Sequence, residues 1–432
     1  MAQGISKVKS MGPLVLLMLA VCLSFWLAPA PQGEPDVEYW GHYARVAPGL
    51  GFVVNHDTYG YLSVAHEPRK LLLPGEVRQS RPLYALLGAA VGYPLAAAFR
   101  VAGQAGIVPN RAPEETLFYG FYSGFVVLNG LALLASLLLL RQVLARLTAG
   151  RGQPWQFYAL AWMLLATPIT KAFFWTVHQQ MFAFLVPLCC LSLAMRLRER
   201  PPLRSAVLAG LALGLGVLPL VYGSFVLLWP ALAFGLLRPA AAAVSPAPAR
   251  AVCWPAVLGK LALSAALFAV PTLLWIALLK TQGTTYYNHE AERYRQFVWL
   301  LDIRIMDFSG YLRVSGNKML EYLGSQQLMA GWLLLGSALY AVTWWRARAA
   351  GTGLRLPPVP AAALAWTAAC FALFFALLGY YPERLAYTLL PLVLCLIGAL
   401  LPYWPGRYAR PLVLAGAAGW HLFILLSYGP FS

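Results

Sequence analysis

The chain has 432 residues, of which 60% are hydrophobic and only 11% are charged, and its mean hydropathy is +0.65. A soluble core cannot bury that share of apolar surface, whereas a lipid bilayer can. The formal net charge of +17 would suit a nucleic-acid partner, but the basic residues do not form one patch. They stand in short connections between apolar runs, so nucleic acid is excluded as a partner and membrane lipid is the expected surrounding.

The apolar runs predict an all-α, polytopic membrane bundle, because only helices and closed barrels satisfy the backbone in lipid. A hydrocarbon layer of about 30 Å takes roughly 20 residues per crossing, which predicts about eleven spans here. We expect residues 1–432 to form a single integral membrane domain. Residues 203–219 and 221–237 are short and rich in glycine, which indicates a tight hairpin or broken helices. The predicted spans are 11–30, 119–140, 155–173, 179–195, 203–219, 221–237, 257–279, 327–345, 359–379, 387–403 and 411–429.

The first apolar run, residues 11–30, shares some features with a secretory signal peptide. Two lysines precede it, and Ala28 to Ala30 stand where a cleavage site would be. The run nevertheless has full spanning length, and Pro31 directly follows the cleavage position. These features favour an uncleaved first span.

The basic residues predict the orientation, because cytoplasmic loops of membrane proteins carry an excess of Lys and Arg. Every acidic residue except Glu199 lies outside these basic connections, in loops that we place on the outer side. Residues 31–118 then form the first extracytoplasmic loop and residues 280–326 the second large one. We expect a bacterial cytoplasmic membrane, with the acid-rich face extracytoplasmic. The basic connections are 141–152, 196–204, 238–250, 346–355 and 406–410.

Residues 82–102 are apolar enough to suggest one more crossing. A single crossing there would reverse the orientation of every basic connection that follows. We therefore expect this segment to lie along the outer leaflet or to dip into it, as a juxtamembrane or re-entrant helix. The alternative is a second, weaker crossing within residues 103–118, a stretch that is polar.

Asp57 is the main candidate for chemistry in the first outer loop. A helix that starts near Asp57 would place Tyr61 and Ala65 on one face, four and eight residues further on. The helix dipole would stabilise the carboxylate at that end. A carboxylate fixed at the lipid–water boundary suits a general base that accepts a proton from a sugar hydroxyl. The alternative is an ordinary N-cap before an amphipathic helix.

Asp36 and Glu38 form a second acidic candidate in the same loop, two positions apart. Such a pair could bind a divalent cation, with water and phosphate oxygens completing the shell. A solvated turn at the membrane interface is the alternative, and it is the more common case. No histidine pair has HExxH spacing and no CxxC pair occurs, so the sequence indicates no zinc site.

Four cations near outer membrane edges are candidates for binding a phosphate. Arginine forks match phosphate oxygens, and an unpaired arginine near lipid is costly. Snorkelling to lipid headgroups is the alternative for some of them. Arg81 and Arg384 adjoin aromatic residues and proline, so they are the preferred candidates. The full set is Arg78, Arg81, Arg384 and Lys171.

Three motifs in the first third of the chain carry a resemblance to a known family. They are "NHDTYGYLSVA" at 55–65, "RQSRPLY" at 78–84 and "VVLNGLALLASLLLL" at 126–140, followed by an arginine-rich turn. In this order they resemble the GT-C superfamily of polytopic glycosyltransferases. The resemblance implies juxtamembrane helices in the first outer loop and transfer of a sugar from a polyprenyl-phosphate donor on the extracytoplasmic face. It also implies a first-loop Asp or Glu as the general base.

The base itself stays open between two residues. Asp36-Val-Glu38 stands where the family pattern has an acidic residue, any residue and Asp, which leaves Asp57 and Asp36 as alternatives, with Asp57 favoured. The competing functions are a lipid-linked glycan polymerase or ligase, and a transporter or lipid flippase, which would need ionisable residues deep within spans. Residues 286–295 form either part of the substrate pocket or an ordered cap on the bundle. The candidate pocket residues are His56, Tyr61, His178, Tyr286, His289, Glu290 and Arg293.

Overall fold

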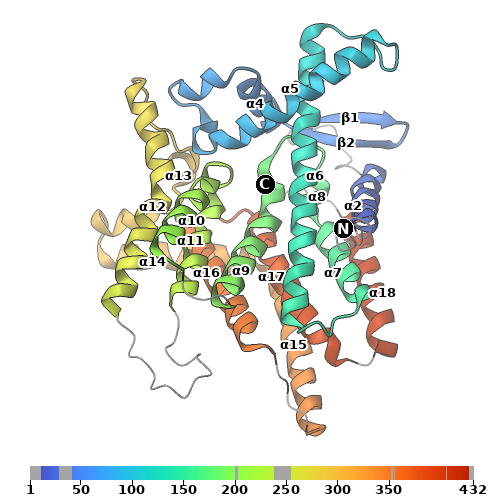
Figure 1. Ribbon diagram of the computed structural model, residues 1–432, viewed down its shortest axis with the longest axis vertical. Helices are drawn as coiled ribbons and strands as arrows, with labels where there is room; N and C mark the ends of the chain where they lie inside the picture. The colour runs from blue at the N-terminus through green and yellow to red at the C-terminus, as the bar shows by residue number, and fades with distance from the viewer. Residues whose placement is uncertain are drawn as a thin grey trace.

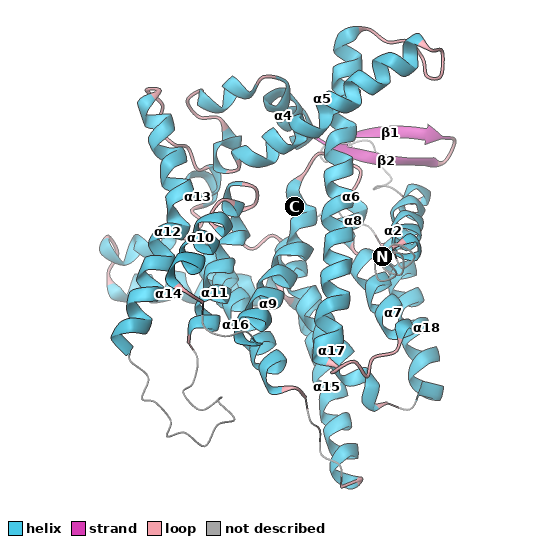
Figure 2. Ribbon diagram, viewed as in Figure 1, coloured by secondary structure: helices cyan, strands magenta, loops and turns pink. Residues whose placement is uncertain are grey.

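The computed structural model describes residues 11–28, 41–199, 203–237, 254–351, 354, 356–404 and 406–427. Helices dominate this part of the chain, and the only sheet within it is one small hairpin (Figure 2). The α-helices are α2 (Gly12–Ser24), α4 (Asp57–His66), α5 (Pro82–Gln104), α6 (Pro113–Leu147), α7 (Pro154–Leu165), α8 (Pro168–Phe173), α9 (Phe182–Glu199), α10 (Ser205–Leu215), α11 (Leu228–Leu236), α12 (Trp254–Thr281), α13 (His289–Tyr294), α14 (Phe308–Ser325), α15 (Gln327–Ala349), α16 (Pro358–Leu378), α17 (Leu390–Leu400) and α18 (Gly406–Leu426).

Short 3₁₀ turns extend or join several of these helices. They are η1 (Phe25–Leu27), η2 (Pro68–Leu72), η3 (Val77–Ser80), η4 (Gln179–Met181), η5 (Leu218–Leu220), η6 (Gly223–Leu227), η7 (Val298–Arg304), η8 (Glu383–Leu389) and η9 (Leu401–Tyr403).

Within the described residues, eight helices are long and apolar enough to cross a membrane. The chain is therefore a helical, multi-pass membrane protein. One of the eight is α5, which we expected at the outer leaflet, and that expectation stays a prediction, as does the count of eleven spans. The eight are Pro82–Gln104, Pro113–Leu147, Gln179–Glu199, Trp254–Thr281, Gln327–Ala349, Pro358–Leu378, Arg384–Tyr403 and Arg407–Leu426.

One expectation about local structure was wrong, and one local feature was not predicted. The span predicted at 155–173 is two helices, α7 and α8, because Pro168 cannot continue the hydrogen-bond ladder and the Thr167 side chain caps α8 at the Thr170 N–H. Besides the helices α4 and α5, residues 31–118 contain the antiparallel strands β1 (Gly41–Ala47) and β2 (Leu50–Asn55), which were not predicted from the sequence. The expectation of broken helices at 203–237 is confirmed, since α10 and α11 are separated by two 3₁₀ turns.

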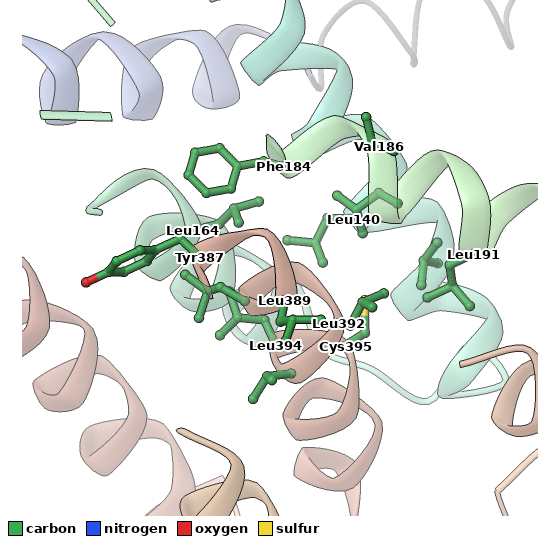
Figure 3. Close-up of a cluster of buried hydrophobic side chains, with 14 of the residues drawn as sticks. Leu140, Leu164, Phe184, Val186, Leu191, Tyr387, Leu389, Leu392, Leu394 and Cys395 are labelled. Carbon is green, nitrogen blue, oxygen red and sulfur yellow. The ribbon is translucent and has the colours of Figure 1, made fainter. Parts of the chain in front are cut away.

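Helix α6 belongs to two hydrophobic clusters. Its second half, from Ala132 to Leu147, packs in the main core with α7, α9 and α17, of which Figure 3 shows Leu140, Phe184 and Leu394. Its first half packs through Phe121 and Phe125 in a smaller core with α4 and α5. These outer elements and the hairpin lie together at one end of the molecule, at the top of Figure 1. Helix α6 thus joins the outer assembly to the bundle.

Candidate functional site

Helix α4 begins at Asp57, as the sequence predicts, and directs its apolar face inward. Tyr61 is 4% exposed and Ala65 is fully buried, which confirms the predicted four-residue spacing. Asp57 is the first residue of the helix and not its cap. Its N–H donates to the side-chain oxygen of Asn55 at 2.7 Å, so the carboxylate is free for contacts with other segments.

The Asp57 carboxylate meets a different partner on each oxygen. Nη2 of Arg78 donates to Oδ1 at 3.2 Å, and Nε2 of His178 lies 3.6 Å from Oδ2. The guanidinium of Arg78 lies directly over the Cα of Gly60, where a Cβ atom would collide with it. It also lies 5.0 Å above the ring of Tyr61, so the first turns of α4 form the surface on which Arg78 rests.

The segment before His178 is held between α6 and α4. From α6, the buried side chain of Asn129 donates to the carbonyls of residues 173, 174 and 176. From α4, the hydroxyl of Thr58 pairs with that of Thr176 at 2.8 Å and accepts the N–H of Val177 at 3.1 Å. The N–H of Asn55 donates to Thr176 at 2.9 Å. These bonds set the position of His178 relative to Asp57.

His178 is neutral in this environment. Burial is the largest cause lowering the pKa of its imidazole; Asp57 opposes the shift and Arg384, Arg81 and Arg78 add to it, and together these effects bring the pKa to about 3. Nδ1 accepts the backbone N–H of Gln180 at 3.2 Å, so the single ring proton is on Nε2, the nitrogen that faces Asp57.

The two large loops, residues 31–118 and 280–326, are joined to each other at this point. Gln79 is fully buried, and its Oε1 accepts the N–H of Tyr287 at 2.9 Å while its Nε2 donates to carbonyls of its own loop. Thr284 donates to the carbonyl of Leu72 at 2.6 Å. Arg81 and Glu290 form a close ion pair between the loops.

Arg384 reaches the same cluster from the 3₁₀ turn η8, which follows α16. Arg81 and Arg384 both act electrostatically on His178 and on the buried Tyr222. Among the described residues, Arg384 has no ion-pair partner, whereas Arg81 is paired with Glu290. Gln180 lies against Tyr222, is 3% exposed, and has an Nε2 without a hydrogen-bond partner among the described groups. Among the described residues, the cluster therefore contains a guanidinium without an ion-pair partner and a buried amide donor without a hydrogen-bond partner.

The remaining predicted site residues fall around this cluster or away from it. Tyr61 lies within it and donates to Gln179, and Tyr286 and His289 lie within the electrostatic range of Arg81. His56 and Arg293 are exposed on its rim. Lys171 is not part of the cluster, because its ammonium binds the carbonyls at the end of α18, at 2.6–3.2 Å.

Asp36 and Glu38 lie outside the described residues, so the predicted divalent-cation site stays a prediction. In the described part of the chain, no three His, Cys, Asp or Glu side chains are grouped as metal ligands.

Three residues of the cluster were given no role by sequence reasoning: Gln79, Gln180 and Tyr222. A signal for Gln180 was present, since "HQQ" at 178–180 is a polar run directly before an apolar span. Gln79 stands inside the "RQSRPLY" motif, but its partners on the second loop leave no local pattern.

Comparison with known proteins gives no relative: no family model, no curated protein and no solved structure matches the chain. A function is therefore inferred from the geometry of this cluster and from the resemblance of the motifs.

Proposed function

We propose that the chain is a glycosyltransferase of the GT-C type, which moves a sugar from a polyprenyl-phosphate-linked donor to an acceptor on the extracytoplasmic face of a bacterial cytoplasmic membrane. The observation that carries the proposal is the convergence of the Asp57 carboxylate from α4 with Arg78 and Arg81 at η3 and Arg384 in η8. Asp57, Arg78, Arg81 and Arg384 surround the buried His178 at the end of the bundle where the outer loops meet.

The proposed chemistry assigns the base to Asp57 and the phosphate to Arg384 and Arg81. The acceptor hydroxyl donates its proton to Asp57 as its oxygen attacks the anomeric carbon, and the sugar–phosphate bond breaks. Negative charge then grows on the leaving phosphate, and fixed guanidinium groups stabilise this charge more in the transition state than in the ground state. Because Glu290 is bound to Arg81 here, a phosphate would bind Arg384 first and then displace Glu290.

The base is tested by Asp57→Asn, which keeps the shape of the side chain and removes its basicity. Membranes containing the variant are supplied with undecaprenyl-phosphate-linked hexoses, and the transferred sugar is measured. We expect transfer to fall by about 10²–10⁴-fold, the usual contribution of a general base. Glu67→Gln is the matched control, because Glu67 lies at the end of the same helix and its side chain is 57% exposed.

Full transfer by Asp57→Asn would reject Asp57 as the base, and loss in Asp36→Asn instead would assign the role to Asp36. A product that carries an oligosaccharide in place of one sugar would favour a glycan ligase or polymerase. Movement of the lipid without any transfer would favour a flippase.

A further inference from the structure

The strongest unassigned feature of the site is the orientation of His178. Its side chain is 6% exposed, and its ring packs on Phe173 with the centroids 4.6 Å apart. The backbone N–H of His178 donates to the carbonyl of Thr176 at 3.0 Å. A side chain buried in this way has little contact with solvent and is poorly placed to bind a sugar.

Both ring nitrogens have a defined direction. Nδ1 is used by the N–H of Gln180, so the proton is on Nε2, and Nε2 points at Oδ2 of Asp57. The 3.6 Å separation is longer than a hydrogen bond, but such contacts often tighten only when the substrate is bound. Burial keeps the ring uncharged. Nε2 carries the proton and Nδ1 already accepts the N–H of Gln180, so His178 has no free nitrogen with which to take the proton in place of Asp57.

The two groups are also held at a fixed separation. Three hydrogen bonds join Asn55, at the end of β2, and Thr58, in the first turn of α4, to residues 176 and 177. On the other side of the carboxylate, Arg78 holds Oδ1. The Asp57 side chain is still 51% exposed, so a hydroxyl can approach the carboxylate between these two partners.

We infer that His178 is a positioning residue, whose Nε2–H group orients the Asp57 carboxylate toward the acceptor hydroxyl. The inference rests on the proposed function, because it gives Asp57 the role of base. It changes the expectation from the sequence, which placed His178 in the substrate pocket. Displacement of a reacting group by about 1 Å can lower the rate by about 100-fold, so the loss of the contact between His178 and Asp57 is measurable in kcat.

Two variants separate this role from a purely structural one. His178→Gln keeps an N–H donor at nearly the reach of Nε2 but removes the acceptor for Gln180. His178→Asn keeps an acceptor at the position of Nδ1, but its amide ends short of Asp57. Each variant is assayed as the full chain in membranes, with undecaprenyl-phosphate-linked hexose as the donor, and its thermal unfolding is followed in detergent.

We expect His178→Gln to retain kcat within a few-fold of the unsubstituted chain, and His178→Asn to lose about 10- to 100-fold in kcat with an unchanged KM for the donor. The inference is overturned by the reverse order of activities, which would show that the acceptor for Gln180 is what matters. It is equally overturned if the two variants have the same activity, or if the loss is in KM or in the unfolding temperature.

A measurement without catalysis keeps this inference separate from the proposed function. In the full chain labelled with ¹⁵N-histidine, the signal assigned to His178, because it disappears in His178→Gln, should be that of a neutral imidazole protonated at Nε2 from pH 5 to pH 8. If the His178 signal becomes doubly protonated in this range, or is protonated at Nδ1, the inference is overturned even if sugar transfer is found. If this signal is present but the unsubstituted chain transfers no sugar, the proposed function fails while the geometry stands.

Discussion

Gly60 lies at the point where Arg78 folds back onto α4, and the absence of a side chain there makes the contact with Asp57 possible. A Cβ atom at this position would collide with the guanidinium, which is the flexible end of a long side chain. The guanidinium can move away without disturbing the backbone, so the effect of a methyl group should be on the contact and not on the fold.

We therefore expect Gly60→Ala to lower sugar transfer by about 10- to 100-fold, because Arg78 is displaced from Asp57. The unfolding temperature should stay the same or rise, since alanine favours a helix over glycine by up to about 1 kcal/mol. Gly210→Ala is the control, as Gly210 is also helical and has no neighbour within 4 Å of the added atom. Equal transfer by both variants would show that Arg78 is not needed at Asp57.

At the scale of elements, the outer assembly depends on how closely α5 approaches α6. A Cβ atom on Gly124 would lie 2.8 Å from the backbone nitrogen of Gly92, and one on Gly92 would collide with Phe121. Small residues at such crossings let two helices touch along their backbones, which is a common way of packing helices in membranes. The α5–α6 pair in turn supports α4 through Tyr84 and Phe125, whose rings pack against Tyr61.

Gly124→Ala should lower the free energy of unfolding by about 1–3 kcal/mol, because the neighbouring atoms belong to the backbone and cannot rotate away. The matched control is Gly130→Ala on the same helix, where the nearest atom is the end of Met18 at 4.0 Å. Thermal unfolding in detergent distinguishes the two variants. Equal unfolding temperatures would contradict the close packing of α5 on α6.

The elements that sequence predicted well are those with a local signal. The start of α4, with Tyr61 and Ala65 inward, follows from spacing along one helix, and the break between α10 and α11 follows from their glycine content. The hairpin at 41–55 was not predicted, although Pro48 and Gly49 mark its turn. The resemblance to the GT-C superfamily implies helices in that loop, and strands were not considered there. The contacts of His178 with Asp57, and of Gln79 with Tyr287, join distant segments and leave no local pattern.

At the scale of the whole molecule, α6 runs from the candidate site to the opposite end of the bundle (Figure 1). Its first half packs beneath α4, while Arg146 near its end pairs with Glu199 at 2.8 Å. Glu199 is the one acidic residue that the sequence places among the basic connections, and it has an arginine partner there. The first turn of α6 holds Glu114 and Glu115 and its last turn holds Arg146, so its two ends differ in charge, while the orientation stays a prediction.

Cysteine labelling tests this orientation directly. In a chain whose native cysteines are replaced by alanine, Arg69→Cys should react with a membrane-impermeant maleimide in intact cells, whereas Ala145→Cys should react only after lysis. Both positions are exposed, so the difference reports the side of the membrane and not burial. Labelling of residue 145 but not residue 69 in intact cells would reverse the orientation and place the Asp57 cluster in the cytosol.

The ion pair of Arg81 with Glu290 has a consequence for selectivity among lipids. Ordinary phospholipids far outnumber a lipid-linked sugar in any bilayer, and each carries a phosphate that an open guanidinium would attract. At Arg81 such a headgroup must exchange with a carboxylate that is already there, so its charge alone brings no net gain. A lipid displaces Glu290 only if its sugar makes further contacts with the protein. This requirement favours the lipid-linked sugar over the more abundant phospholipids.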